Sequence, residues 1–354
     1  MKKIIIDPNN IDQGLVAEAA DTILNGGVVA LPTETVYGLA AAFDRRDAVG
    51  RLYKIKKRSA DKPFTFVVGD IEKVRSDCFS PLPPFGHRLI EKFWPGPLTI
   101  IYYAPNNKTL GVRVPSHAVT RQILKQVNKA VCLPSANISG EKEAVSASGV
   151  ESIFGDQIDM VVDGGVCSYS KPSTIIDLTF HPFEIVRSGV VSQRHIVEVF
   201  TGKRILFVCT GNTCRSPMAQ LLLEKSILEN FSHLRDRYEI VSRGISASDG
   251  AVLSKEAQLI LGQKEDMQVS GFVPKKLDRQ IILSSDLIFT MEEEQKKYIL
   301  HLEPTAEGRV FTLGKFIQSM REKDIPDPIG KGMEVYARTY SLIKEAILEL
   351  GEWL

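Results

Sequence analysis

The first 200 residues alternate between helical and strand-like spacing of hydrophobic positions. Apolar residues at helical spacing over residues 15–25 end at Gly26-Gly27, a pair that often terminates a helix. A second helical segment covers residues 46–57. Short apolar runs bounded by glycine, proline and polar residues predict strands at residues 28–31, 64–68, 98–103, 160–162, 173–178 and 184–186. This order predicts an α/β domain with a twisted, mixed sheet over residues 1–200.

The remaining residues begin a second strand–helix series. A short predicted helix over residues 193–200 and the junction Thr201-Gly202 precede an apolar strand at residues 203–208. Further predicted strands lie at residues 239–242, 287–290 and 309–312, and helical segments separate them. The final helix, residues 333–353, places most of its apolar residues roughly on one face: Val335, Tyr336, Tyr340, Ile343, Ile347 and Leu350. We expect a Rossmann-like α/β domain over residues 203–354, with a four-stranded parallel sheet between helices.

Composition places the chain among reduced globular proteins. Of its 354 residues, 44% are hydrophobic and 25% are charged, which is ordinary globular usage. No apolar run reaches the roughly 18 residues that a membrane helix needs. The cysteines are too few and too scattered for a disulfide framework or a zinc finger: Cys78, Cys132, Cys167, Cys209 and Cys214. We therefore expect a cytoplasmic protein with no membrane partner and no resident metal ion.

Net charge does not indicate nucleic-acid binding in either half. The formal net charge of the whole chain is only +1. Neither half is basic enough to indicate an RNA partner by charge alone, because such proteins usually carry a strong positive excess. Any RNA role for the first 200 residues therefore depends on local basic patches.

One loop combines a candidate nucleophile with a candidate phosphate cradle. It follows a predicted strand and enters a predicted helix, and it reads Val208-Cys209-Thr210-Gly211-Asn212-Thr213-Cys214-Arg215-Ser216-Pro217. A loop of this length turns backbone N–H groups inward as an anion nest, and the helix N-terminus adds positive potential. The planar guanidinium of Arg215 can bind two phosphate oxygens. The same field favours a thiolate, so Cys209 is the candidate nucleophile.

This loop resembles the signature of the low-molecular-weight protein phosphatase family, in which five residues separate a cysteine from Arg-Ser. The segment Pro326-Asp327-Pro328 resembles the family's distant acid loop. The resemblance covers residues 203–354 and implies that Cys209 attacks phosphorus to form a phosphocysteine. It implies that Arg215 binds the equatorial oxygens, and that Asp327 protonates the leaving group and then deprotonates water. No cofactor is implied for this domain.

Other residues of the same motifs receive supporting roles from the resemblance. It implies that Ser216 donates a hydrogen bond to the thiolate and that Asn212 braces the loop. Cys214 is close enough in sequence to trap Cys209 as a reversible disulfide, although a small buried filler is the alternative interpretation. Asp324 is a rival for the acid, but it lacks the following proline, and we expect it to be an ordinary loop residue.

Two positions bear on the phosphorylated substrate. At the position of Thr213 the tyrosine-specific branch of the family usually has isoleucine, whereas the bacterial arginine-phosphatase branch has threonine. A hydroxyl there can orient water or a phosphoguanidinium group. The tyrosine branch also places a tyrosine after Asp-Pro, where Ile329 and Gly330 stand in this chain. The resemblance therefore implies phosphorylated proteins as partners and favours phosphoarginine, with phosphotyrosine as the alternative.

Polar islands follow several predicted strands of the first 200 residues. They are Pro32-Thr33-Glu34-Thr35-Val36-Tyr37-Gly38, Lys56-Lys57-Arg58 with Lys62, Val112-Arg113-Val114-Pro115, Pro134-Ser135-Ala136-Asn137, Ser173-Thr174-Ile175-Ile176-Asp177 and Val186-Arg187-Ser188-Gly189. Cations at a helix end complement the helix dipole and can hold phosphates. No Walker loop or dinucleotide fingerprint is present, so any ATP must be bound in another way.

In this order the islands resemble the YrdC-type threonylcarbamoyl-AMP synthases over about residues 10–200. The resemblance implies that L-threonine, bicarbonate and ATP become threonylcarbamoyl-AMP and pyrophosphate, with Mg²⁺ on the ATP phosphates. The product would supply the threonylcarbamoyl-transfer machinery that modifies adenosine beside the tRNA anticodon. By matched position, Thr33, Arg113 and Ser173 hold threonine. Arg58, Lys62, Thr109, Ser135 and Arg187 hold ATP, while Lys56 and Asn137 shape the cavity.

Together the two resemblances imply a bifunctional enzyme, a nucleotidyltransferase joined to a cysteine-dependent phosphatase. The alternative is a phosphotyrosine phosphatase whose first 200 residues form an RNA-binding module without catalysis.

Overall fold

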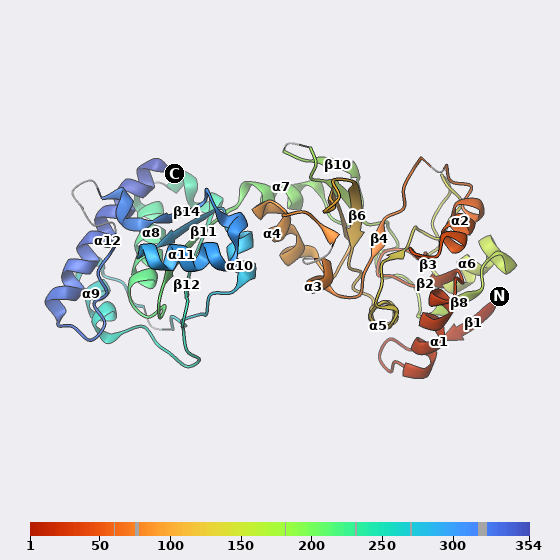
Figure 1. Ribbon diagram of the computed structural model, residues 1–354, viewed down its shortest axis with the longest axis horizontal. Helices are drawn as coiled ribbons and strands as arrows, with labels where there is room; N and C mark the ends of the chain where they lie inside the picture. Colours follow the sequence, from red (N-terminus) through yellow and green to blue (C-terminus); the bar gives the residue numbers. More distant parts are fainter. Residues whose placement is uncertain (60, 75–77, 181, 231, 270, 318–323) are drawn as a thin grey trace. The chain divides into compact units, whose positions relative to one another are not determined.

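The computed structural model describes residues 1–59, 61–74, 78–180, 182–230, 232–269, 271–317 and 324–354 (Figure 1). The chain divides into two compact units, residues 1–82 with 89–197 and residues 83–88 with 198–354. This division runs through helices α4 (Pro84–Phe93) and α7 (Gln193–Thr201). Apart from residues 83–88, the second unit runs from Glu198 onward, which is near the predicted junction at Thr201-Gly202.

Ten strands form one mixed sheet in the described part of the first unit, in the order β1-β8-β2-β3-β7-β4-β6-β5-β9-β10. The strands are β1 (Lys2–Ile5), β2 (Val29–Leu31), β3 (Gly38–Ala42), β4 (Phe66–Val67), β5 (Leu98–Tyr103), β6 (Thr109–Arg113), β7 (Val131–Cys132), β8 (Met160–Asp163), β9 (Thr174–Asp177) and β10 (Glu184–Arg187). The other helices are α1 (Gln13–Leu24), α2 (Arg46–Ile55), α3 (Ile71–Lys73), α5 (Ala118–Val127) and α6 (Ala147–Phe154). The predicted mixed α/β fold is confirmed.

Strand β2 shows how this sheet separates two cores. Successive side chains of a strand point to opposite faces. Val29 and Leu31 pack into one core together with residues of α1 and α5. Ala30 packs into the opposite core together with residues of α2 and α6. Burial on both faces explains why this strand has a continuous apolar run rather than an alternating one.

The described residues include strands that the hydrophobic pattern did not predict, namely β1, β3 and β7. Strand β3 is Gly-Leu-Ala-Ala-Ala, a composition with little β propensity, and β7 has only two residues. Helix α2 ends at Ile55, two residues before its predicted end, because Lys57 takes a left-handed conformation with φ of 49°. That turn directs the chain away from the helix axis immediately after Lys56.

The second unit has the predicted four-stranded parallel sheet, in the order β12-β11-β13-β14. Its strands are β11 (Lys203–Cys209), β12 (Tyr238–Gly244), β13 (Leu287–Thr290) and β14 (Val310–Thr312). Its helices are α8 (Arg215–Asn230), α9 (Lys255–Glu265), α10 (Arg279–Ser284), α11 (Glu293–Leu302) and α12 (Met333–Trp353). Ile205 and Phe207 of β11 pack toward α8, α9 and α12, whereas Leu206 and Val208 pack toward α10 and α11. Helices therefore cover both faces, as predicted.

A buried carboxylate joins three helices of the second unit. Glu265, at the end of α9, contacts Lys225 of α8 at 2.8 Å and also Tyr340 and Lys344 of α12. Burial by itself would raise the Glu265 pKa. The hydrogen bonds from the three partners outweigh burial and lower the pKa from 4.5 to about 2. The ionised carboxylate therefore stabilises the packing of these helices in Figure 1.

We predict that Glu265→Gln destabilises the second unit in a pH-dependent way. A depressed carboxyl pKa stabilises the folded state above pH 4.5, and this contribution is lost as pH falls toward about 2. We expect a loss of about 3 kcal/mol in the free energy of unfolding at pH 7, shrinking to roughly half or less at pH 3. Urea unfolding followed by Trp353 fluorescence, with Trp94→Phe in both proteins, measures it. An equal loss at both pH values would contradict the prediction.

Candidate active sites

The loop at the carboxyl end of β11 places a cysteine sulfur beside two polar groups. Strand β11 ends at Cys209 and helix α8 begins at Arg215, so the five intervening residues form the turn. The Cys209 Sγ atom lies 2.9 Å from the Ser216 hydroxyl and 3.3 Å from the backbone N–H of Asn212, which donates to it. Cys209 and Ser216 are both buried. The sulfur therefore sits at the base of an anion-binding loop at a helix N-terminus.

Asn212 holds this loop in shape through its backbone and both ends of its amide. Its φ of 55° is left-handed, a conformation that asparagine tolerates. Its Nδ2 donates to Ser216 at 3.0 Å and to Ser242 at 2.9 Å, and its Oδ1 accepts the Lys275 N–H at 2.8 Å. Gly244 of β12 permits the close approach, since a Cβ there would lie 2.8 Å from the Asn212 nitrogen. The bracing role that the sequence suggested for Asn212 agrees with this geometry.

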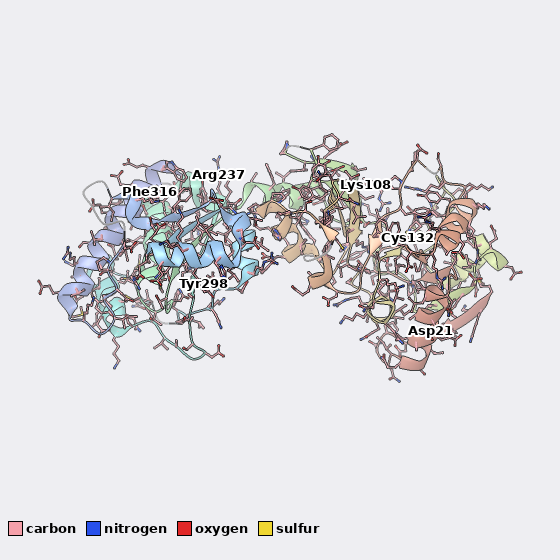
Figure 2. The ribbon with its side chains drawn as sticks, viewed as in Figure 1. Asp21, Lys108, Cys132, Arg237, Tyr298 and Phe316 are labelled. Carbon is pink, nitrogen blue, oxygen red and sulfur yellow. The ribbon has the colours of Figure 1, made fainter. Side chains whose placement is uncertain are left out.

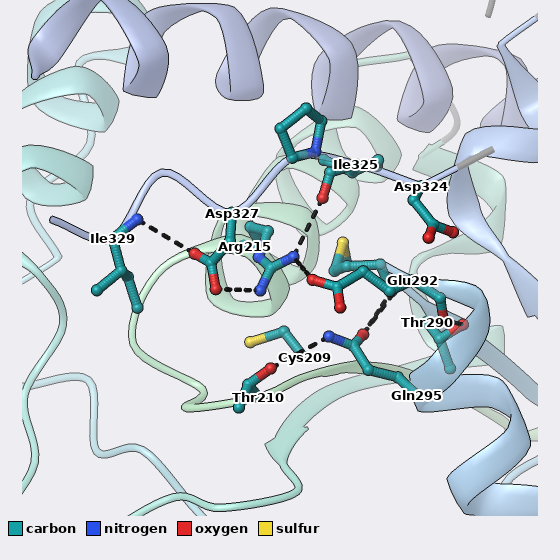
Figure 3. Close-up of polar contacts among 12 residues, drawn as sticks. Cys209, Thr210, Arg215, Thr290, Glu292, Gln295, Asp324, Ile325, Asp327 and Ile329 are labelled. Atoms are coloured by element: carbon teal, nitrogen blue, oxygen red, sulfur yellow. Dashed lines mark hydrogen bonds and ion pairs between the residues drawn. The ribbon is translucent and has the colours of Figure 1, made fainter. Parts of the chain in front are cut away.

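Arg215 is almost fully buried and links the loop to two carboxylates (Figure 3). Its Nη2 is paired with Asp327, and its Nη1 is paired with Glu292 and donates to the Ile325 carbonyl at 3.1 Å. Asp327 comes from the Pro326-Asp327-Pro328 segment, so the structure brings this predicted acid to the predicted loop. Glu292 is not among the site residues predicted from the sequence. The available signal was its place just after β13, whose carboxyl end lies beside that of β11.

The rival acid Asp324 has a different partner. Its Oδ1 accepts the backbone N–H of Glu293 at 2.7 Å, and its side chain is exposed. Asp327 accepts the Ile329 N–H at 3.1 Å, and Ile329 is itself about half exposed. Asp324 therefore supports the start of α11, whereas Asp327 contacts Arg215. Thr213 is half-buried in the loop, and its carbonyl accepts the Ser254 N–H at 2.8 Å.

Burial makes three of the cysteines weak acids. It raises the pKa of Cys132 to about 12, of Cys167 to about 11 and of Cys214 to about 12. Figure 2 labels Cys132, which lies on β7 within the first unit. Cys214 is free in this structure, and its pairing with Cys209 stays a prediction.

A pocket in the first unit gathers seven of the ten predicted binding residues. These are Thr33, Lys56, Arg58, Arg113, Ser135, Ser173 and Arg187. Four of the seven are cations, and the described lining includes no carboxylate. Such a lining suits an anionic ligand, because fixed positive groups in a partly enclosed site attract phosphate and carboxylate groups strongly.

Arg113 is held in this pocket by a buried glutamate. Its Nη2 is 2.6 Å from a carboxylate oxygen of Glu34, and its Nε donates to the Gly96 carbonyl at 3.1 Å. The other Glu34 oxygen accepts the Ser116 N–H at 3.0 Å. Neither contact of Arg113 uses Nη1, so this end of the guanidinium can meet a ligand. Glu34 has no role among the sequence-based predictions, although it lies within the predicted polar turn.

Lys56 is turned inward and bonded to the loop that carries Ser135. Its Nζ donates to the carbonyl and the side-chain oxygen of Asn137, at 2.7 and 3.0 Å, and to the Ser135 carbonyl. Burial and the nearby charge of Arg58 lower the Lys56 pKa from 10.5 to about 8. Asn137 itself is not part of the pocket lining, but its Oδ1 accepts a hydrogen bond from the Ser135 hydroxyl at 2.7 Å. Lys56 and Asn137 therefore both contact the segment that carries Ser135, and their predicted role in shaping the cavity stays a prediction.

The remaining lining groups are also held by neighbours. Arg187 donates twice to the Ser173 carbonyl, at 3.0 and 2.9 Å, and burial lowers the Arg187 pKa. The Ser173 hydroxyl lies 3.0 Å from that of Thr99. The Thr33 hydroxyl donates to the Val36 carbonyl at 2.6 Å, so it fixes the turn after β2. These contacts preorganise the pocket.

Lys62 and Thr109 do not line this pocket. The Lys62 carbonyl accepts a hydrogen bond from Arg58 at 2.9 Å, which fixes the Arg58 side chain. Thr109 begins β6 and pairs with Tyr103, four residues from Arg113 at the other end of the strand. Four strand residues span about 13 Å. A role in ATP binding stays an untested prediction for both residues.

Within the described residues, no group of three or more His, Cys, Asp or Glu side chains is placed to hold a metal ion. None of the helices in that part of the chain is both long and apolar enough to span a bilayer.

Two family models match successive parts of the chain. Residues 21–189 match the Sua5/YciO/YrdC model, described as "Telomere recombination". Residues 204–354 match the model described as "Low molecular weight phosphotyrosine protein phosphatase".

Two relatives of known sequence match the first part of the chain. A putative threonylcarbamoyl-AMP synthase of Mycobacterium leprae is 34% identical over 203 residues, which cover 54% of this chain and 90% of that protein. The threonylcarbamoyl-AMP synthase of Pyrococcus abyssi is 33% identical over 216 residues, which cover 58% of this chain and 63% of that longer protein. The crystal structure of P. abyssi Sua5 complexed with L-threonine covers 88% of this chain and 99% of its own, with 21% identity and a TM-score of 0.54. The match to the P. abyssi structure shows a shared fold and no more.

These matches agree with the loop, acid segment and cationic pocket described above. The chain belongs to the Sua5/YciO/YrdC family through residues 21–189, and its residues 204–354 form a domain of the low-molecular-weight phosphotyrosine protein phosphatase family, so that it joins domains of two enzyme families.

Proposed function

We propose that this chain is a bifunctional cytoplasmic enzyme. Residues 1–200 would make threonylcarbamoyl-AMP from L-threonine, bicarbonate and ATP for tRNA modification. Residues 203–354 would dephosphorylate proteins, with phosphoarginine as the preferred substrate. For the synthase, the supporting observation is the pocket lined by Lys56, Arg58, Arg113 and Arg187 without a lining carboxylate. For the phosphatase, the supporting observation is that Cys209, Arg215 and Asp327 lie together at one loop.

Threonine would lie in the part of the pocket formed by Arg113 and Ser173. The Nη1 end of Arg113 suits a carboxylate, since it carries N–H donors that the contacts with Glu34 and Gly96 do not use, on a group of fixed positive charge. Glu34 and Gly96 would keep the guanidinium in place while the ligand binds. The L-threonine bound to the P. abyssi protein and the synthase activity in the names of both relatives support this assignment.

ATP would lie toward Arg58, Ser135 and Arg187. The guanidinium charges of Arg58 and Arg187 would neutralise phosphate oxygens as pyrophosphate leaves. The lining supplies no carboxylate, so a Mg²⁺ ion would be held by the ATP phosphates themselves and would help to neutralise their charge. The residues of the chain then act mainly by orienting the threonine carbamate toward the α-phosphate.

We predict pyrophosphate release only when threonine, bicarbonate, ATP and Mg²⁺ are all present. Arg113→Lys keeps the charge but loses the planar donor pair, so the KM for threonine should rise roughly tenfold or more. A coupled pyrophosphate assay with one component omitted at a time measures both effects. Pyrophosphate release without threonine would contradict the synthase assignment. Salt-sensitive tRNA binding with no pyrophosphate under any condition would favour the RNA-binding module instead.

In the phosphatase domain, the Cys209 sulfur would attack phosphorus while Arg215 and the loop N–H groups hold the phosphoryl oxygens. The S–P bond forms as the bond to the leaving group breaks, and Asp327 gives its proton to that leaving nitrogen or oxygen. Water then attacks the phosphocysteine, Asp327 accepts its proton, and inorganic phosphate and the free thiolate are released. Ser216 would donate its hydrogen bond to the sulfur in the thiolate state.

Phosphoarginine is favoured by the groups around this loop. Thr213 offers a hydroxyl where isoleucine would be wholly apolar. Ile329 stands where an aromatic wall would otherwise meet a phenol ring. The Glu292 carboxylate places negative charge beside Arg215, and Asp327 becomes a second carboxylate once it has given up its proton. Both charges suit the cationic guanidinium group that leaves.

We predict that Asp327→Asn lowers kcat toward a phosphoarginine peptide by roughly 100-fold or more, the usual contribution of a general acid. Asp324→Asn is the matched control and should change kcat little, because Asp324 bonds the backbone of Glu293 instead. Phosphate release at saturating peptide measures both variants. Equal losses in the two variants would contradict the assignment of the acid.

We also predict that substrate preference depends on the Thr213 hydroxyl. The wild-type chain should hydrolyse a phosphoarginine peptide faster than the same peptide carrying phosphotyrosine. Thr213→Ile should shift the ratio of the two kcat/KM values toward phosphotyrosine. Thr213→Ser keeps the hydroxyl and is the control. A wild-type preference for phosphotyrosine would reject the arginine-phosphatase assignment and leave a tyrosine phosphatase.

A further inference from the structure

A buried glutamine lies between the two sides of the phosphatase site. Gln295 is in the first turn of α11 and is only 3% exposed. Its Nε2 donates to the Thr210 hydroxyl at 3.3 Å, and its Oε1 accepts the backbone N–H groups of Met291 and Glu292, at 3.0 and 3.2 Å. Figure 3 shows this side chain between Thr210 and the turn that carries Glu292.

Two of the three partners of Gln295, Thr210 and Glu292, belong to opposite sides of the phosphate cradle. Thr210 directly follows Cys209, and its carbonyl accepts the Ser246 N–H at 2.8 Å, so it is part of the loop wall. Glu292 pairs with the buried guanidinium of Arg215. A shift of the Gln295 amide would therefore displace both the loop beside the sulfur and the carboxylate that orients Arg215.

The orientation of the Gln295 amide is fixed by its neighbours. The two backbone N–H groups need an acceptor, so Oε1 must face them and Nε2 must face Thr210. A carboxylate in this place could accept both N–H bonds but could not donate to Thr210, and it would add negative charge beside Glu292. A methionine would fill the volume without making any of the three bonds. Glutamine is therefore suited to connecting these two segments.

We propose that Gln295 is a positioning residue of the phosphatase site, which couples Thr210 to the Glu292–Arg215 pair and so sets the geometry of the phosphate cradle. The inference rests on the proposed phosphatase function and deepens it. Gln295 would not touch the substrate. It would hold Arg215 and the loop in positions where both can contact the phosphate. A misplacement of about 1 Å in such a site can lower the rate by up to roughly 100-fold.

The test compares Gln295→Met, Thr210→Val and Thr210→Ser in the full chain. We expect Gln295→Met to lower kcat/KM for a phosphoarginine peptide roughly 10- to 100-fold. Thr210→Val removes only the hydroxyl that Gln295 contacts, so its loss of kcat/KM should be smaller than that of Gln295→Met. Thr210→Ser keeps the hydroxyl and should retain wild-type activity. The double variant Gln295→Met with Thr210→Val should lose no more than Gln295→Met alone, because both changes break the same bond. Gln258→Met, on α9, is the control.

A second measurement separates positioning from simple support of the fold. Inorganic phosphate should protect Cys209 from alkylation by iodoacetamide, and the phosphate concentration for half protection should rise in Gln295→Met and Thr210→Val. A purely structural glutamine would lower thermal stability but leave this concentration unchanged in the folded protein. Unchanged protection and unchanged kcat/KM in Thr210→Val would overturn the proposal, even if Gln295→Met failed to fold.

The same assay distinguishes failure of the inference from failure of the proposed function. If the wild-type chain hydrolyses no phosphorylated peptide but phosphate protects Cys209 and the two variants weaken that protection, the positioning role stands and the phosphatase assignment falls. If the wild-type chain is an active phosphatase and the variants match it in both assays, the positioning role is rejected. If phosphate does not protect Cys209 in the wild type, the loop does not bind phosphate, and the positioning role of Gln295 is rejected as well.

Discussion

The interaction on which the second unit's site depends is the burial of the Arg215 guanidinium. A charge that is only 2% exposed must be matched by partners, since an unpaired buried charge costs several kcal/mol. Asp327, Glu292 and the Ile325 carbonyl supply those partners. Satisfying one cation therefore brings together segments that follow different strands and lie far apart in the sequence. The candidate acid reaches the candidate nucleophile as a consequence of this pairing.

The first unit also contains buried cations, which different residues stabilise. Lys56 is as buried as Arg215, and the loop at Ser135 and Asn137 surrounds its ammonium group with oxygen atoms. Arg113 is fixed by Glu34. In each unit, cations held by the protein remain close to a pocket or loop where an anion can be bound. Preorganisation of this kind means that a phosphate or carboxylate ligand meets groups already in place.

Site residues could be predicted from the sequence where they lie close together in it and form a recognisable motif. Cys209, Asn212 and Arg215 lie in one loop, so their proximity follows from the strand–loop–helix order. Asp327 is identified through the resemblance of Pro326-Asp327-Pro328 to the acid loop of the phosphatase family. Glu292 and Gln295 have the spacing of a helix capping box, which is a local signal for the start of α11 but not for a role beside Arg215. The pairing of Glu292 with Arg215 and of Glu34 with Arg113 forms only when separate segments of the chain come together. Thr109 begins strand β6 and Arg113 ends it, so the spacing in sequence does not by itself bring these two predicted residues to one place.

The measurement that tests the account most directly follows both activities in one preparation of the full chain. Wild type, Cys209→Ser and Arg58→Ala would each be assayed for threonine-dependent pyrophosphate release and for hydrolysis of a phosphoarginine peptide. The account predicts both activities in wild type, loss of only the phosphatase in Cys209→Ser, and loss of only the synthase in Arg58→Ala. A wild-type chain that lacks either activity, or a single substitution that removes both, would contradict it.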